Sequence, residues 1–125
     1  MRVLVIEDDA QLRQVMGIFL RGLGAEVLAE IPDGKAALEH LAGDAHEPPD
    51  LILTDCQMPR MDGISMVRHL RARGDQTPVI MISGQQDPQI VALAYEAGVD
   101  EYLPKPLTTD SLTMAITRTF PNFAA

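Results

Sequence analysis

Short apolar runs alternate along the chain with longer segments in which apolar residues recur every three or four positions. The short runs are typical of buried strands, and the longer segments are typical of amphipathic helices. The predicted strands cover residues 3–6, 26–31, 51–54, 78–82 and 100–103. The predicted helices cover residues 9–23, 35–41, 64–73, 88–97 and 108–120. The pattern therefore predicts five repeats of a strand followed by a helix.

Turn-forming and capping residues separate these segments. Gly24 and Gly98 follow predicted helices and are expected to end them. Asp87 followed by Pro88 is typical of an N-cap and a first helical residue, and Thr108 is the expected N-cap of the last helix. The remaining connections include a turn at 32–34, a loop at 46–49 and a short tail at 121–125.

Regular alternation of strands and helices predicts an α/β fold, because parallel strands need crossover helices that cover both faces of the sheet. The chain has 125 residues, the usual size of one domain, and shows no linker, low-complexity tract or internal repeat. We therefore expect one domain over residues 1–125, built on a doubly wound parallel sheet.

The charge balance is strongly acidic, with 18 Asp and Glu against 10 Lys and Arg and a formal net charge of −8. Such a chain repels nucleic-acid phosphates and anionic lipids, so we expect no direct binding to nucleic acid or membrane. No apolar run approaches the roughly 20 residues of a membrane span. Cys56 is the only cysteine in the sequence and is expected to be a small buried residue. A single cysteine cannot form an internal disulfide, which fits a reducing compartment, so a cytoplasmic location is expected.

Charged and hydroxyl side chains follow four of the five predicted strands. They are Glu7, Asp8 and Asp9 after the first strand, Asp55 after the third, Ser83 after the fourth and Lys105 near the end of the fifth. The carboxyl ends of parallel strands meet at one edge of a sheet, so these side chains are expected to converge. Clustered carboxylates repel one another unless a cation intervenes, and oxygen ligands of this kind suit Mg²⁺. A carboxylate beside a metal and a lysine is suited to accept a phosphoryl group.

Each of these residues also has a simpler interpretation when it is taken singly. Asp9 is placed to cap the following helix, Ser83 precedes a glycine and could form a turn, and Lys105 could be a solvated surface lysine. Phosphatases of the haloacid dehalogenase type also carry an Asp after a strand, but they require a second Asp two residues later, where this chain has Gln57. The three histidines show no ligand spacing: His40, His46 and His69. For Ser83, Lys105 and Tyr102, only the shared sheet edge favours the functional interpretation.

The sequence resembles the receiver domains of two-component response regulators, of the chemotaxis-regulator-like kind, over essentially its whole length. The matching segments are residues 3–9, 53–63, 79–83 and 102–106. Each segment is a weak signal alone, but their order and their positions at strand ends are specific. The resemblance implies a flavodoxin-like fold with strand order 2-1-3-4-5 and five helices.

The resemblance also implies a role for each acidic residue. Asp55 corresponds to the phosphorylated aspartate, and the acidic pair of the family falls on Glu7 and Asp8. Mg²⁺ would be bound directly by Asp8, by Asp55 and by the backbone carbonyl of Gln57, and by Glu7 through water. Asp9 would be a flanking acid that caps the next helix.

Four further positions match residues that act on the phosphoryl group or transmit its presence. The resemblance implies that Ser83 hydrogen-bonds the phosphoryl oxygens and that Lys105 pairs with them. Lys105 and Pro106 would be joined by a cis peptide bond. Tyr102, three residues before the lysine, matches the aromatic switch position, so Ser83 and Tyr102 would form the switch.

A receiver of this kind implies a phosphorylation-controlled switch, not an enzyme that turns over external substrates. The phosphoryl group would come from a histidine kinase or a phosphotransfer protein. The output face would be built by the last two predicted helices and the last predicted strand, residues 88–97, 100–103 and 108–120. If the chain is complete, the lack of a DNA-binding module after Phe120 directs output through protein contacts. Two alternatives are a receiver that is part of a longer regulator or hybrid kinase, and a receiver that binds partners without phosphorylation.

Overall fold

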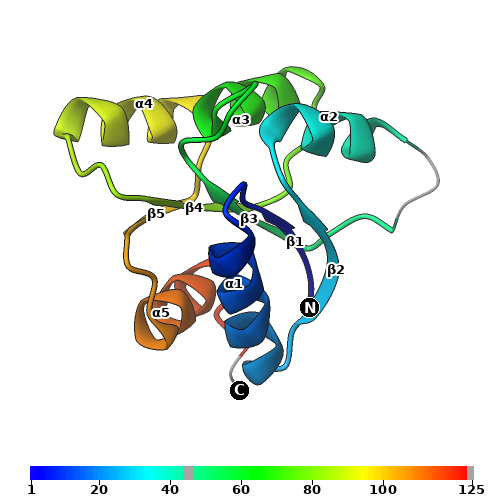
Figure 1. The fold of residues 1–125 in the computed structure, drawn as a ribbon, viewed down its shortest axis with the longest axis vertical. Helices are drawn as coiled ribbons and strands as arrows, with labels where there is room; N and C mark the ends of the chain where they lie inside the picture. Colours follow the sequence, from blue (N-terminus) through cyan, green and yellow to red (C-terminus); the bar gives the residue numbers. More distant parts are fainter. Residues whose placement is uncertain (44–46, 124–125) are drawn as a thin grey trace.

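The computed structural model describes residues 1–43 and 47–123, so parts of the predicted loop at 46–49 and of the predicted tail, and His46, lie outside the described residues. The ten predicted elements are all present (Figure 1). The strands are β1 (Arg2–Ile6), β2 (Glu26–Ile31), β3 (Leu51–Asp55), β4 (Val79–Ser83) and β5 (Glu101–Pro104). The helices are α1 (Ala10–Gly22), α2 (Gly34–Ala42), α3 (Gly63–Ala72), α4 (Pro88–Ala97) and α5 (Thr109–Thr119).

The five strands form one parallel sheet with the order β2-β1-β3-β4-β5. Helices α1 and α5 cover one face of the sheet, and α2, α3 and α4 cover the other (Figure 1). The predicted doubly wound fold and the strand order implied by the resemblance are both confirmed. The chain passes from β1 to β2 on one side of it, and then returns to β3 on the other side of β1. From β3 it continues outward to β4 and β5, so the direction of the strand order reverses at β1 and β3. Such a reversal is where doubly wound sheets place their ligand sites.

Alternate residues of the central strands enter two separate cores. Val3 and Val5 of β1 join the core under α1 and α5, whereas Leu4 and Ile6 join the core under α2, α3 and α4. Successive side chains of a strand point to opposite faces, and a parallel sheet is covered on both. That double burial explains why β3 and β4, which are buried at every position, read as continuous apolar runs without polar alternation.

The helix caps follow the sequence prediction closely. Asp9 caps α1, Asp87 caps α4, and Thr108 caps α5 through a reciprocal pair with Ser111. Gly98 ends α4 with a φ of 114°, a left-handed conformation that favours glycine. The prediction for Gly24 is corrected by one position, because Leu23 is the C-cap of α1 and Gly24 lies just beyond it.

Three strands extend one residue further than predicted at the functional edge. Asp55 is the last residue of β3 and pairs with Ile82, and Ser83 is the last residue of β4 and pairs with Pro104. Neighbouring strands hold the backbone of both residues, so their side chains project from a rigid sheet.

Within the described residues, no helix is both long and apolar enough to cross a membrane.

Candidate functional site

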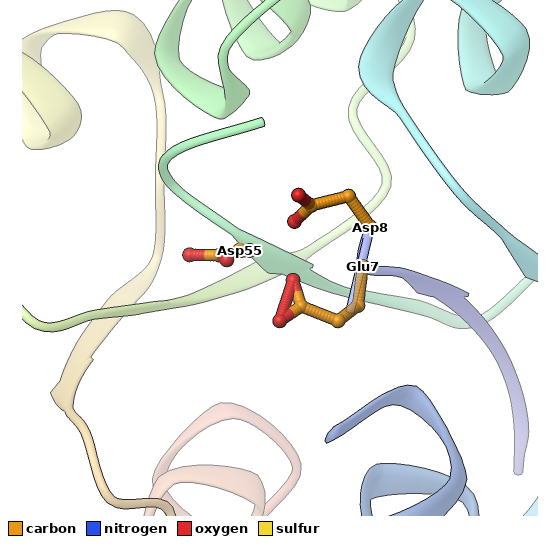
Figure 2. A group of neighbouring side chains, drawn as sticks. All are labelled: Glu7, Asp8 and Asp55. Carbon is orange, nitrogen blue, oxygen red and sulfur yellow. The ribbon is translucent and has the colours of Figure 1, made fainter. Parts of the chain in front are cut away.

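Three carboxylates meet at the carboxyl edge of the sheet (Figure 2). Glu7 and Asp8 follow β1, and Asp55 ends β3; one oxygen from each lies within 4.8 Å of the other two. The two strands are paired neighbours, with Ile6 opposite Thr54, so the residues that follow them must come together. Asp9, the third acid of the run, instead accepts hydrogen bonds from the first turn of α1.

Glu7 is the most deeply placed of the three acids. It is fully buried, and neither of its carboxylate oxygens has a hydrogen-bond partner among the described residues. Burial, followed by the nearby Asp55 carboxylate, raises the pKa of Glu7 to about 8. A buried charge without a hydrogen bond is costly, so this site favours either a proton on Glu7 or a cation between the carboxylates. The donor set, all oxygen, fits a hard divalent ion.

Lys105 reaches the same cluster from the end of β5. Its Nζ atom lies 2.8 Å from Asp55 Oδ2 and 3.7 Å from Glu7 Oε1, and the peptide bond between Lys105 and Pro106 is cis. Burial by itself would lower the pKa of Lys105, but the hydrogen bond and the charge of Asp55 leave it above its ordinary value. Lys105 therefore stays a cation in contact with the carboxylate.

Ser83 lies at the end of the neighbouring strand and begins a chain of hydrogen bonds. The buried Ser83 Oγ accepts a bond from the backbone N–H of Gln85 at 3.0 Å. The carbonyl oxygen of Gln85 accepts a bond of 2.7 Å from the Tyr102 hydroxyl. The backbone N–H of Tyr102 in turn donates to the Tyr95 hydroxyl at 3.2 Å. This chain connects the edge of β4 to β5 and α4, and Gln85 is its central link.

Hydrogen bonds hold the loop that runs from Asp55 to Gly63. The N–H of Gly63 donates to the Cys56 carbonyl at 2.7 Å, and Asp62 caps α3. Arg60 takes a left-handed φ of 67° and donates from its guanidinium to Asp33, the N-cap of α2, at 3.1 Å. The loop is thereby tied to α2.

Sequence reasoning did not find several of these contacts. Tyr95 carries no motif signal. Arg60 lies in a matching segment and Asp33 in a predicted turn, but neither pattern indicates their contact, because the two residues are 27 positions apart. Gln57, which was predicted to supply a carbonyl ligand, donates its N–H to Asp55 Oδ1 at 3.3 Å. The other predicted site residues are close to one another or on adjacent strand ends: Glu7, Asp8, Asp55, Ser83 and Lys105.

The raised pKa of Glu7 predicts a pH-dependent stability. The native state holds a proton on Glu7 up to about pH 8, whereas the unfolded chain loses it near the ordinary pKa of 4.5. Without metal, the free energy of unfolding should therefore fall as pH rises from 5.5 to 8, by about 3 kcal/mol from this group. Urea denaturation of Glu7→Gln should lack that part of the fall, and Mg²⁺ should stabilise the wild type more at pH 8 than at pH 5.5. Identical pH profiles for wild type and variant would contradict the prediction.

Taken together, the edge offers a carboxylate positioned on a rigid strand, a lysine in contact with it, and two further acids that suit a cation. A buried hydroxyl lies at the end of the next strand. The Asp55 carboxylate could attack an electrophilic phosphorus, and Lys105 and a bound cation would supply positive charge to the phosphoryl oxygens.

Comparisons with known proteins identify the family. The model of the response regulator receiver domain matches residues 3–117. The chain is 39% identical to the Regulator of RpoS from Escherichia coli K12 over 85% of its length, and 36% identical to the response regulator MprA from Mycolicibacterium vanbaalenii over 89%. It spans 30% and 46% of those two relatives.

Solved structures agree with this assignment. The receiver domain of the Francisella response regulator 1452 superposes with a TM-score of 0.82 at 31% identity, covering 94% of this chain and 98% of that one. A response regulator receiver domain protein from Clostridium thermocellum gives a TM-score of 0.84 at 28% identity, covering 96% and 94%. With the acidic edge and its lysine already in place, these matches show that the chain belongs to the family of response regulator receiver domains.

Proposed function

We propose that this receiver domain is a signalling switch that takes a phosphoryl group onto Asp55 from the phosphohistidine of a histidine kinase or phosphotransfer protein. The observation that carries the proposal is the position of Asp55. The residue is 2% exposed and ends a central strand. Its carboxylate contacts Lys105 at 2.8 Å and lies against the Glu7 and Asp8 carboxylates. A merely structural aspartate would not need two further acids and a lysine around it.

The transfer follows from the contacts of Asp55. A carboxylate oxygen attacks the phosphorus, the bond from phosphorus to the donor imidazole nitrogen breaks, and the imidazole leaves with that electron pair. The product is an acyl phosphate on Asp55. Lys105 Nζ, now on the carboxylate, shifts to a phosphoryl oxygen, and Ser83 Oγ donates to another. In a separate step, water attacks the phosphorus and the bond from phosphorus to the Asp55 oxygen breaks. This step returns the Asp55 carboxylate and inorganic phosphate, so the domain assists its own phosphorylation and dephosphorylation.

The acidic cluster fits Mg²⁺, and its fit is supported by the two buried Glu7 oxygens, which have no hydrogen-bond partner in the described part of the chain. Asp8, Asp55 and the Gln57 carbonyl would hold the ion directly, and Glu7 would hold it through water. When bound, the ion supplies positive charge that neutralises the carboxylates and the phosphoryl oxygens.

The metal-dependent phosphorylation is tested by incubation with acetyl phosphate followed by intact-protein mass spectrometry. One phosphoryl group should be added with Mg²⁺ and none with a chelator; equal labelling in both would contradict the metal-dependent reaction.

We further propose that phosphorylation reaches the surface formed by α4, β5 and α5 through the chain from Ser83 to Tyr102. A phosphoryl group on Asp55 adds charge and acceptor oxygens beside Ser83. A movement of the Ser83 hydroxyl toward those oxygens displaces Gln85, because the two share a hydrogen bond. Gln85 also accepts from the Tyr102 hydroxyl, so the ring and the face around it must respond. A few kcal/mol between two packings suffices for such a switch.

The Ser83→Ala variant separates this route from a purely local response. Beryllofluoride with Mg²⁺ mimics the phosphoryl group, and in the wild type it should shift amide resonances across residues 84–107. In Ser83→Ala those shifts should shrink several-fold, whereas shifts around Glu7 and Asp55 should remain. If residues 84–107 respond equally in both proteins, the signal does not pass through Ser83.

A further inference from the structure

A hollow lies beside the loops that follow Asp55 and Ser83. Residues of α3 and α4 line it, and these two helices pack next to each other (Figure 1). The cavity has a volume of about 270 Å³ and opens to solvent. Its apolar lining consists of Cys56, Ile64, Ile90 and Leu93. Leu93 is 39% exposed, and α4 carries a single charged residue, so the hollow continues into an apolar surface. The volume approaches the lower end of small-molecule sites, which start at about 300 Å³.

The polar rim of the cavity has one cation available for a ligand. Arg68 lines the cavity, is exposed, and forms no hydrogen bond or ion pair with the described residues. Asp62, the acid on the same rim, already accepts bonds from the backbone N–H and the hydroxyl of Ser65, and it caps α3. The charge of Asp62 is therefore engaged by the helix terminus, whereas the Arg68 guanidinium is free to bind a carboxylate in a charge-assisted pair.

Two residues of the cavity wall also form hydrogen bonds with residues of the phosphorylation site. Gln57 donates its N–H to Asp55 Oδ1, and Gln85 donates its N–H to Ser83 Oγ while its carbonyl accepts from Tyr102. Any movement of the loops after β3 and β4 must change the wall of the cavity. A ligand that prefers one shape of that wall must, by linkage, alter the equilibrium at the phosphorylation site to the same extent.

We propose that the α3–α4 cavity is a binding site for a small amphipathic carboxylate, and that its occupancy is coupled to the state of Asp55 through Gln57 and Gln85. The ligand has a compact apolar body, which packs on Ile64, Ile90 and Leu93, and one carboxylate, which pairs with Arg68. The coupling half of this proposal rests on the proposed function, whereas binding to the unphosphorylated domain does not.

Three matched probes test the ligand class: 3-phenylpropionate, 3-phenylpropanamide and 3-phenylpropylammonium. Each is titrated into isotope-labelled protein without metal, and amide and methyl resonances are followed by NMR. The acid should give saturable shifts at Ile64, Ile90 and Leu93, bind at least about fivefold more tightly than the amide, and outcompete the ammonium. No saturable shift at millimolar acid, or equal affinity for acid and amide, would overturn the proposal.

Two arginine variants locate the carboxylate. Arg68→Gln should reduce acid binding to the level of the amide and leave amide binding unchanged, because only the charged pair is lost. Arg21→Gln is the matched control, since Arg21 is also exposed but pairs with Glu30 on the other side of the molecule. A Kd for the acid that is unaffected by Arg68→Gln, or is equally affected by both variants, would rule out the assigned pairing.

The coupling is measured by repeating the acid titration with beryllofluoride and Mg²⁺ present. The Kd should change by about fivefold or more, the usual range for coupled sites. An unchanged Kd, in a protein whose Asp55 loop resonances have shifted, would overturn the coupling. If beryllofluoride produces no shift around Asp55, the proposed function fails instead, and the metal-free titrations still decide whether the cavity binds the carboxylate.

Discussion

Asp55→Asn is expected to reduce labelling by acetyl phosphate to the background of the assay. The carboxamide is a far weaker nucleophile than the carboxylate, and it cannot yield the acyl phosphate that the wild type forms. The substitution also removes one of the three carboxylates that lie within 4.8 Å of one another. Thermal melts should show a folded variant that gains less stability from Mg²⁺ than the wild type does, because a metal ligand has been lost.

Asp62→Asn provides the matched control for that substitution. Asp62 belongs to the same loop, is exposed, and caps α3, a role that asparagine performs about equally well. Its labelling and Mg²⁺ response should equal those of the wild type. Peptide mapping of the phosphorylated wild type should place the group on Asp55. Equal labelling of Asp55→Asn, or a phosphoryl group mapped to another residue, would show that the site has been assigned wrongly.

Gly63→Ala is expected to destabilise the fold and to displace the phosphoacceptor at the same time. A Cβ atom at Gly63 would overlap the Asp55 carbonyl oxygen and lie 2.9 Å from Met81 Cε and 3.2 Å from Cys56 Cα. Two of those three neighbours are backbone atoms of the phosphoacceptor segment, so they can yield only if that segment moves. We expect a loss of about 3 kcal/mol in the free energy of unfolding, and a fall of roughly 10 °C in Tm.

Gly22→Ala is the control for the Gly63 substitution. Gly22 lies in α1, and a Cβ atom there would meet nothing within 4 Å. Gly22 is exposed and is the last residue of α1, where the preference for alanine is weak, so this variant should match the wild type within about 0.5 kcal/mol. Chemical denaturation measures both variants, and titration with Mg²⁺ measures the displacement of Asp55, which should weaken metal binding only in Gly63→Ala. Similar stabilities for the two variants would mean that the loop after Asp55 has more room than its geometry indicates.

The sequence by itself determined which elements form and where the chemistry gathers. Apolar spacing is a local property, so it predicted all ten elements, and the side chains of Asp87 and Thr108 marked helix starts because a cap bonds to its own helix. The convergence of Asp55 and Lys105 followed from parallel strands, whose carboxyl ends share one edge. The strand order came from the resemblance to receiver domains, since periodicity alone does not say which strands are neighbours.

Only the tertiary structure decided the contacts between residues that are distant in sequence. The burial of Glu7, which leaves its oxygens without a hydrogen-bond partner among the described residues, depends on the elements packed around the end of β1. The bond from Arg60 to Asp33 spans 27 positions and the bond from Tyr102 to Gln85 spans 17. Such pairs depend on distance and orientation in space, which no local pattern encodes. The same reason applies to the α3–α4 cavity, because its walls come from four segments that meet only in the folded chain.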